Sequence, residues 1–444
     1  MVLPERVLIV GFRRTGQAVA RLLAARGVAV SVADMTPAAQ LAVDPGDWPG
    51  VAFHLGDDGA GLVGDVDLVV PSPGVPVGAP VLVAARHGGV PVWSEIELAS
   101  RLLECPLIAI TGTNGKSTTT TLVGLALERA GRRTFTGGNL GTPLVSAVAN
   151  PPEIAVAEVS TFQLEWVLRL RPRIACLLNV TPDHLDRHAS FAEYRDLKAR
   201  LFAAQQAGDV AVLNRDDPSV WSLAPQLAAK VVSFGMAPTT TGAFAADGAA
   251  VLRLPSAPEE RYDLSRTRLA GRHNLENILA AVTVARLAGA PADAVQAAID
   301  TIEPLRHRLA LVAERAGVRW FDDSKATNVG AAVKSLESFP GPVVLLAGGL
   351  GKGGDYAPLA KAAVGKVTLA LVFGAARAEV GAALATAGVR VEEAKSLEAA
   401  VAAAGAAVRP GDTVLLAPAC SSFDMFTDYA ARGRAFQAAV EALR

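Results

Sequence analysis

The feature that most constrains the fold is the repeated alternation of short apolar runs with longer Ala- and Leu-rich stretches. Gly, Pro or Asp bounds most of the runs. This pattern is typical of parallel β-sheets whose strands are joined by crossover helices. We therefore predict an α/β fold with three series of strands: Val7–Val10, Val28–Ala33, Val51–His54, Leu68–Val70 and Val90–Val92; Leu107–Ile110, Ile154–Val159, Ile174–Asn179, Val210–Leu213 and Val231–Phe234; Val318–Phe321, Val343–Ala347, Thr368–Phe373 and Thr413–Ala417.

Chain length and prolines divide these series into domains. At about 150 residues per domain, 444 residues predict roughly three domains. Proline interrupts the pattern near Trp93–Pro106 and near Ile302–Leu305. We expect domains at residues 1–95, 96–304 and 305–444. The Gly/Thr/Pro-rich segment 237–258 is expected to be irregular or antiparallel within the second domain.

Composition excludes several classes of protein. A hydrophobic content of 51% is enough for more than one core and excludes a mainly disordered chain. With 42 basic and 43 acidic residues, a general nucleic-acid binder is disfavoured. No apolar stretch approaches the ~18 residues of a membrane span, and the N-terminus does not resemble a signal peptide. Three widely spaced cysteines suit a reducing compartment, so we expect a cytoplasmic protein.

The first domain carries an incomplete dinucleotide-binding fingerprint. Strand Val7–Val10 leads into the turn 11–16, and Asp34 ends the next strand at the distance typical of a ribose-binding carboxylate. Arg13 occupies the position of the glycine that lets a pyrophosphate approach, which disfavours an NAD-dependent dehydrogenase. The helix start at Thr15 can still receive an anion, assisted by Arg13 or Arg14. Ser72 and Gly74 follow another strand end, where ligand loops lie.

The second domain begins with the strongest functional signal. Strand Leu107–Ile110 enters TGTNGKST, in which a lysine and two hydroxyl residues open a helix. Backbone N–H groups of such a loop wrap phosphates, the lysine reaches the terminal phosphates, and the hydroxyl that follows binds Mg²⁺. Ile110 stands where the standard motif has its first glycine. The predicted ATP-binding residues are Gly112, Thr113, Asn114, Gly115, Lys116, Ser117 and Thr118.

Further candidates follow neighbouring strands. Glu158 ends the strand 154–159, and His184 lies in NVTPDHLDRH after the strand 174–179. Lys198 lies on a predicted helix at 194–202, and the chain has only nine lysines. Each residue alone has an ordinary structural interpretation, such as a helix cap or a solvated side chain. Together with the phosphate loop they suggest a magnesium cluster that faces a triphosphate.

These motifs resemble those of the Mur ligase family of peptidoglycan synthesis. The resemblance rests on TGTNGKST, GNLG at 138–141, EVSTFQLE, NVTPDHLDRH and the lysine of DLKARLF. It implies a CO₂-derived carbamate on Lys198, and two Mg²⁺ sites, which Mn²⁺ can also fill, at Ser117, Glu158, His184 and Lys198. It also implies that the nucleotide sugar contacts Asn139, Ser160 and Gln163, in addition to Thr15, Asp34, Ser72 and Gly74.

The third domain indicates the amino acid. The segments GRHNLEN at 271–277 and LRHR at 305–308 resemble the family's ATP contacts and imply that Asn277, Arg308 and Asp323 bind ATP. DSKATN at 323–328 and the GGLGK loop are similar to the branch that adds D-glutamate. An acceptor with two carboxylates suits cationic and hydroxyl donors. The expected D-glutamate ligands are Lys325, Thr327, Lys352, Ser422 and the backbone near Tyr429. Arg13, Arg14 and Met35 depart from the family's usual residues beside the uridine nucleotide.

The resemblance implies a complete reaction. ATP phosphorylates the terminal carboxylate of UDP-N-acetylmuramoyl-L-alanine, and the amine of D-glutamate attacks the acyl phosphate, in a pathway required for cell wall, shape and division. Lys116, Glu158, His184 and Lys198 would be catalytic. A monomer acting on these three small molecules is expected, without nucleic acid or membrane. The alternatives are another Mur ligase, a ligase like folylpolyglutamate synthetase, or a non-catalytic nucleotide-sugar sensor.

Overall fold

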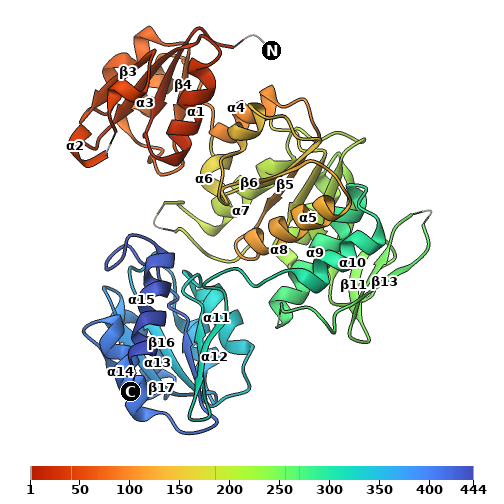
Figure 1. Cartoon of the computed structure of the whole chain (residues 1–444), viewed down its shortest axis with the longest axis vertical. Helices are drawn as coiled ribbons and strands as arrows, with labels where there is room; N and C mark the ends of the chain where they lie inside the picture. The colour runs from red at the N-terminus through yellow and green to blue at the C-terminus, as the bar shows by residue number, and fades with distance from the viewer. Residues whose placement is uncertain (1–2, 42, 186, 256, 270, 444) are drawn as a thin grey trace. The chain divides into compact units, whose positions relative to one another are not determined.

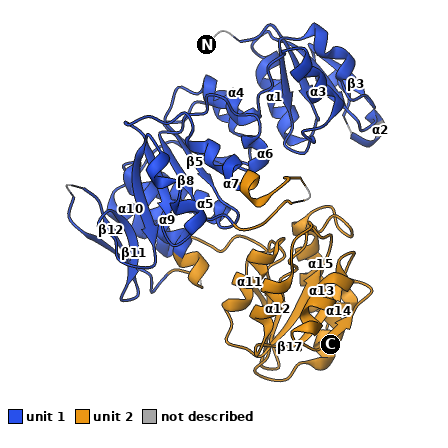
Figure 2. Ribbon diagram, turned by 180° about the vertical axis from the view of Figure 1, so that it is seen from behind, with its two compact units in different colours: residues 1–180, 195–266, 276–301 blue, residues 181–194, 267–275, 302–444 orange. Residues whose placement is uncertain are grey.

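The computed structural model describes residues 3–41, 43–185, 187–255, 257–269 and 271–443. Their strands form three sheets of four, nine and six strands, which confirms the α/β class (Figure 1). The chain divides into two compact units, residues 1–180, 195–266 and 276–301 and residues 181–194, 267–275 and 302–444 (Figure 2). The domain limits at 95/96 and 304/305 stay predictions.

The first sheet is parallel with the order β3-β2-β1-β4. A core cluster joins it to helix α3 and the 3-10 helix η2. The expected strand at 90–92 is wrong, because Val92 forms only an isolated bridge with Val69. The elements are β1 (Arg6–Val10), α1 (Arg14–Ala24), β2 (Ala29–Asp34), α2 (Ala38–Leu41), η1 (Pro45–Asp47), β3 (Val51–Leu55), η2 (Ala60–Asp65), β4 (Leu68–Pro71) and α3 (Pro80–His87).

The second sheet has the order β13-β12-β11-β10-β9-β8-β5-β7-β6. Of its parallel strands, β5, β7, β8, β9 and β10 were predicted. The strands β6, which is rich in Thr and Gly, and β11, which pairs parallel with β10, were not. The strands are β5 (Leu107–Thr111), β6 (Thr134–Gly138), β7 (Ile154–Glu158), β8 (Ile174–Leu177), β9 (Val210–Asn214), β10 (Lys230–Gly235), β11 (Gly242–Ala246), β12 (Ala249–Arg253) and β13 (Glu260–Asp263). The last three pair antiparallel with one another, whereas β11 is parallel to β10. The expectation of antiparallel structure within 237–258 is therefore confirmed for the pair β11 and β12.

Helices flank this sheet, and α5 contacts β5, β6 and β7. Burial from these helices explains why β5 reads as an uninterrupted apolar run rather than an alternating one. The helices of this part of the chain are α4 (Glu95–Leu102), α5 (Lys116–Arg129), η3 (Leu144–Val148), α6 (Thr161–Leu164), α7 (Phe191–Ala199), η4 (Arg200–Phe202), α8 (Pro218–Trp221), η5 (Ala224–Gln226), α9 (Arg272–Leu287) and α10 (Ala292–Thr301).

The third sheet has the order β14-β15-β19-β16-β17-β18, and only β14 is antiparallel to its neighbour. One core cluster joins it to α11, α12 and α13, and another joins it to α14 and α15. The elements are β14 (Ala310–Arg315), β15 (Val318–Asp322), α11 (Val329–Glu337), β16 (Val343–Gly348), α12 (Ala357–Ala363), β17 (Val367–Phe373), α13 (Arg377–Thr386), β18 (Val391–Glu393), α14 (Leu397–Ala407), β19 (Thr413–Leu416) and α15 (Tyr429–Ala442).

A buried carboxylate on α4 fixes the segment after α6. Glu97 is 0% exposed and accepts hydrogen bonds from the backbone N–H groups of Leu168 and Leu170 at 3.0 and 2.9 Å. The Arg101 guanidinium donates to the same carboxylate at 2.6 Å. The carboxylate thus supplies hydrogen-bond acceptors for backbone N–H groups of a turn that pairs with no strand.

We expect Glu97→Gln to destabilise the first unit by about 3 kcal/mol, because it leaves Arg101 without its buried counter-charge. Urea unfolding followed by tryptophan fluorescence measures the change. Glu104→Gln is the matched control, since Glu104 is exposed, and should change stability by less than about 0.5 kcal/mol. Equal stability of both variants would contradict this role for Glu97.

Candidate active site

The loop between β5 and α5 forms the predicted phosphate cradle. Gly112 and Gly115 have φ of 157° and 85°, values that a glycine adopts without strain. Asn179, at the end of the neighbouring β8 segment, holds the loop in shape. Its carbonyl accepts from the Thr113 N–H, and its side-chain oxygen accepts from the Asn114 N–H, both at 2.8 Å.

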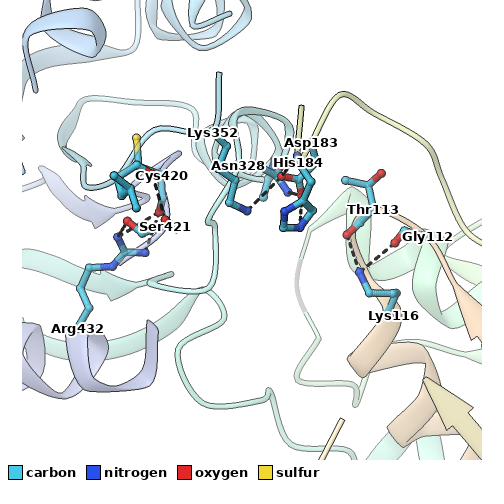
Figure 3. Close-up of polar contacts among 12 residues, drawn as sticks. Gly112, Thr113, Lys116, Asp183, His184, Asn328, Lys352, Cys420, Ser421 and Arg432 are labelled. Carbon is cyan, nitrogen blue, oxygen red and sulfur yellow. Dashed lines mark hydrogen bonds and ion pairs between the residues drawn. The ribbon is translucent and has the colours of Figure 1, made fainter. Parts of the chain in front are cut away.

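Lys116 lies over this loop. Its ammonium donates to the carbonyl oxygens of Gly112 and Thr113, both at 2.9 Å (Figure 3). Ser117 and Thr118 are buried in the first turn of α5. The geometry matches the sequence prediction of a strand, a glycine-containing loop and a lysine at the start of a helix, and it places a cation beside backbone that can bind phosphate.

Two further predicted residues join the loop. Lys198 is 1% exposed, and its ammonium donates to the Gly112 carbonyl at 2.9 Å, so Lys116 and Lys198 share one acceptor. Glu158 ends β7 in register with Ile110 of β5. The Asn139 side-chain amide donates to the Glu158 carboxylate at 2.7 Å. The structure thus brings Lys116, Glu158 and Lys198 to the carboxyl ends of adjacent strands.

Asn277 packs directly against the phosphate loop. A Cβ on Gly115 would lie 2.0 Å from the Asn277 side-chain oxygen, so only glycine fits there. Asn277 is buried on α9. This close approach places a predicted ATP-binding residue beside the loop that would bind the phosphates.

Some residues at the phosphate loop could bind a magnesium ion, and others could not. Glu158 and Ser117 offer oxygen ligands, which Mg²⁺ prefers, whereas an unmodified Lys198 ammonium would repel the ion. Within the described residues, no group of three or more His, Cys, Asp or Glu side chains could bind a metal together. A metal at this loop would therefore need oxygens from the substrate or from a modified Lys198.

The predicted nucleotide-sugar residues in the first sheet lie at the carboxyl ends of β1, β2 and β4. The Asp34 carboxylate accepts from the N–H groups of Phe12 and Thr36 at 2.7 and 2.8 Å. The Ser72 hydroxyl donates to the Gly11 carbonyl at 2.8 Å. Thr15 lies in the first turn of α1, and Gly74 follows Ser72 in the β4 loop. Asp34 and Ser72 thus also shape the turn.

Arg13 and Arg14 are both exposed at the start of α1. Arg14 donates to the Gly141 carbonyl at 2.8 Å, which connects this helix to the GNLG loop that carries Asn139. The sequence did not predict this connection.

Ser160 and Gln163 form a capping box at the start of α6. The Gln163 amide also reaches the buried Glu95 carboxylate at 3.5 Å. Burial raises the pKa of Glu95 to about 7, although hydrogen bonds from Val145, Gln163 and Leu144 partly oppose the shift. The positions of Ser160 and Gln163 are therefore fixed by contacts within the protein.

In the second unit, Asp183 joins two loops of the third sheet. Its carboxylate accepts from the Lys352 ammonium at 3.1 Å and from the Asn328 amide at 2.8 Å (Figure 3). Burial alone would raise the pKa of Asp183, but the charges of Lys352 and His184 and the hydrogen bonds of Lys352 and Asn328 lower it overall. Asn328 also caps α11 by accepting from the Ala331 N–H.

His184 adopts a left-handed backbone conformation with φ of 54°. Non-glycine residues in this region concentrate at functional sites. Its N–H donates to the adjacent Asp183 carboxylate at 2.9 Å. His184 belongs to the second unit, and its membership of the reaction centre at the phosphate loop stays a prediction.

The predicted amino-acid ligands follow three central strands of the third sheet. Lys325 and Thr327 lie in the loop after β15, Lys352 follows β16, and Ser422 follows β19. The Lys325 ammonium lies 3.9 Å from the centre of the Tyr429 ring, a cation–π contact. Strands β15, β19 and β16 are neighbours, so these loops share one edge of the sheet.

Asp323 is a buried carboxyl group beside Arg308. Burial raises its pKa to about 6, although a hydrogen bond from the Ser335 hydroxyl and the charge of Arg308 partly oppose the shift. His273 is close enough to be affected by Lys334 and Arg308, and its pKa falls to about 4 through burial first and then these charges. The predicted ATP residues Arg308 and Asp323 thus lie in one cluster.

Sequence reasoning missed Asp183, Asn179 and Asn328. The first two lie inside the motif NVTPDHLDRH, and Asn328 ends DSKATN, so their positions were a usable signal.

Each of the three sheets lies in a part of the chain that matches a domain of one ligase family. Family models match residues 5–94 (Mur ligase MurD-like, N-terminal domain), 110–285 (Mur ligase middle domain) and 307–420 (Mur ligase, glutamate ligase domain). The chain belongs to the Mur ligase family.

Relatives of known function match the whole chain. It is 45% identical over 444 residues to UDP-N-acetylmuramoylalanine–D-glutamate ligase of Geobacter metallireducens, an alignment that covers 99% of this chain and 98% of the relative. It is 46% identical to the protein of that name from Anaeromyxobacter dehalogenans, with 98% of both covered.

Solved structures share the fold. The UDP-N-acetylmuramate–alanine ligase MurC of Thermotoga maritima matches with a TM-score of 0.60 and 18% identity, and 99% of this chain and 100% of that chain are covered. Folylpolyglutamate synthase of Mycobacterium tuberculosis matches with a TM-score of 0.58 and 18% identity, over 76% of this chain and 92% of that chain. Likeness of fold alone therefore does not distinguish which amino acid a ligase adds or to which substrate the amino acid is joined.

The raised pKa of Asp323 predicts a pH-dependent stability. The folded state binds this proton more tightly than the unfolded chain, whose pKa is about 4. The contribution is present below about pH 4 and is lost as the pH rises through about 6, in total about 1–3 kcal/mol. Asp323→Asn should remove this component. Denaturant unfolding at pH 4.5–8 measures it, with the exposed Asp196→Asn as control; identical pH profiles of wild type and Asp323→Asn would exclude it.

Proposed function

We propose that the chain is an ATP-dependent amide ligase that joins D-glutamate to UDP-N-acetylmuramoyl-L-alanine through an acyl phosphate, in the synthesis of the peptidoglycan precursor. One observation carries the chemistry: Lys116 and the buried Lys198 donate to the same Gly112 carbonyl of a phosphate loop, and Glu158 ends the adjacent strand. The full-length relatives with this activity support the choice of substrates.

The loop residues would perform the phosphoryl transfer. Backbone N–H groups at 112–118 hold the phosphates, and the Lys116 ammonium leaves its loop carbonyls to neutralise charge on the transferred group. Asn277, Arg308 and Asp323 hold the rest of ATP. The substrate carboxylate attacks the γ-phosphorus, ADP leaves, and the resulting acyl phosphate is an electrophile that the free carboxylate is not.

Magnesium, bound with help from Ser117, Glu158, His184 and Lys198, supplies positive charge that stabilises the phosphates during transfer. Lys198 fits such a site only after modification. Lys198 is 1% exposed, and only its unprotonated amine can react with CO₂. That amine adds to CO₂, loses a proton and becomes a carbamate, an anionic oxygen ligand. Two metal ions, magnesium or manganese, would then be held at this loop.

Lys325, Thr327, Lys352, Ser422 and Tyr429 would bind D-glutamate. The two lysines match the two carboxylates of this amino acid in charge. In the structure Lys352 is paired with Asp183 at 3.1 Å, which fixes its ammonium while leaving other N–H donors for the substrate. The amine of D-glutamate then attacks the acyl carbon, phosphate leaves, and an amide results.

The first sheet would bind the nucleotide sugar through Thr15, Asp34, Ser72 and Gly74, together with Asn139, Ser160 and Gln163 from the second. Arg13 and Arg14, exposed at the start of α1, add positive charge there.

We assign residues 1–95 to the nucleotide sugar, 96–304 to ATP and 305–444 to the amino acid. We infer a cytoplasmic monomer; within the described residues, no helix is long and apolar enough to cross a membrane.

An amino-acid screen tests the substrate. Purified protein is incubated with ATP, Mg²⁺, UDP-N-acetylmuramoyl-L-alanine and single amino acids, and phosphate release is measured. We expect D-glutamate to support the fastest turnover because the site offers two lysines. Turnover with folate and L-glutamate would favour the synthetase alternative, preference for L-lysine would favour another Mur ligase, and absence of phosphate release would favour a sensor.

Lys198→Ala tests the carbamate. Without the anionic ligand, turnover should fall by at least about 100-fold, as expected for a lost metal ligand or its supporting group. Added acetate or formate should restore part of it by supplying a carboxylate in the vacated space. Lys230→Ala, which alters an exposed lysine, is the control. Full activity of Lys198→Ala without added acid would reject the carbamate.

A further inference from the structure

Arg432 is a charged side chain with no exposed surface. It lies near the start of α15 and is 0% exposed. Charged residues are almost never fully buried unless they are paired with an opposite charge. Arg432 forms no ion pair with any carboxylate in the described part of the chain. All of its side-chain hydrogen bonds go to neutral oxygens instead.

The acceptors of the Arg432 guanidinium come from two loops of the third sheet. It donates to the Ser324 hydroxyl and carbonyl at 3.0 and 2.9 Å. It also donates to the carbonyls of Cys420 and Ser421 at 3.1 Å (Figure 3). These five hydrogen bonds use the full donor capacity of the side chain, and they tie the β15 loop to the β19 loop.

A third loop packs against the same group. A Cβ on Gly349, in the loop after β16, would lie 3.0 Å from an Arg432 nitrogen and 2.2 Å from the Ser421 carbonyl. Gly349 has a φ of 130°, so its lack of a side chain leaves room for the guanidinium. The cation therefore contacts all three central loops at the carboxyl edge of the sheet, where open α/β sheets bind ligands.

The charge of Arg432 persists at neutral pH. Burial lowers its pKa to about 10, against the opposing influence of Cys420, Asp424 and Asp322. The buried Asp322 carboxylate is engaged elsewhere, since it lies 2.6 Å from the His307 ring and accepts from Gln437 at 2.9 Å. A positive charge thus remains beneath the loops, and no carboxylate among the described residues bonds to it directly.

The same loops carry the residues proposed to bind the amino acid. Lys325 directly follows Ser324, and Ser422 directly follows Ser421. The Ser324 hydroxyl, which accepts from Arg432, donates to the Tyr429 carbonyl at 2.8 Å. A displacement of the guanidinium would therefore move three of the proposed ligands together.

We propose that Arg432 is the positioning residue of the amino-acid site, and that its buried charge favours an acceptor with two carboxylates over one with a single carboxylate. The inference rests on the proposed function. The side chain does not contact the substrate. It acts by holding the loops that bear Lys325 and Ser422 and by its fixed positive potential at the sheet edge.

Steady-state kinetics of Arg432→Lys and Arg432→Met test the two parts of the proposal. Lysine keeps the charge but cannot reproduce five hydrogen bonds, and methionine removes both. We expect the KM for D-glutamate to rise about tenfold or more in each, since hydrogen bonds to charged groups of this kind are lost. The KM values for ATP and for UDP-N-acetylmuramoyl-L-alanine should stay within about twofold. Arg434→Met is the matched control because Arg434 is exposed on the same helix.

The charge effect has its own readout. The ratio of kcat/KM for D-glutamate to that for D-glutamine, which lacks the second charge, should fall about tenfold in Arg432→Met and less in Arg432→Lys. A merely structural role would lower kcat for both amino acids equally and leave the ratio unchanged, which would overturn the proposal.

Ser324→Ala provides a second test of the proposal if the variants of Arg432 do not fold. It removes one acceptor of the guanidinium and the link to Tyr429, and it should raise the KM for D-glutamate without changing that for ATP. An unchanged KM for D-glutamate would overturn the positioning role. Wild-type turnover with D-glutamate in the same assay tests the proposed function separately, so the two failures are distinguishable.

Discussion

The convergence of two lysines on the carbonyl oxygen of Gly112 is the contact on which the candidate reaction centre depends. Two ammonium groups that share one acceptor repel each other, and the loop carbonyls that accept their hydrogen bonds offset part of this repulsion. Such a pair produces a positive electrostatic potential that attracts anions. A triphosphate beside Lys116 would supply negative charge, and conversion of the Lys198 ammonium into a carbamate would remove one of the two like charges. The proposed phosphoryl transfer is therefore compatible with this geometry.

The parallel sheet is what makes this convergence possible. All strands of a parallel sheet have their carboxyl ends at the same edge, so loops that are distant in sequence meet there. Gly112 follows β5, Glu158 ends β7 and Asn179 follows β8. The third sheet repeats the principle with the loops after β15, β16 and β19. Charged residues that are buried at both edges, such as Lys198 and Arg432, are held by carbonyl groups that the strand ends leave available.

Sequence patterns predicted most strands, because strands covered by helices read as unbroken apolar runs. They failed where the signal was weak: β6 is composed of Thr, Phe and Gly, and the run at 90–92 forms a single bridge rather than a strand. They predicted the phosphate loop and its lysine, because glycine and lysine spacing is dictated by local backbone geometry. They gave no indication that Asn139 would bond to Glu158 or that Asp183 would bond to Lys352, since those pairs are 19 and 169 residues apart.

The amino-acid sequence by itself determined the class of fold, the order of the sheets, the phosphate loop and the list of chemical groups available, because each of these follows from local periodicity or from a short motif. Tertiary structure alone decided which groups are buried together. Lys198 shares an acceptor with Lys116, and Arg432 lies beneath three loops and forms no ion pair with the residues that the structure describes. Both facts depend on strand order and on helix packing. Burial and partner choice are properties of the packed chain, and no local pattern encodes them.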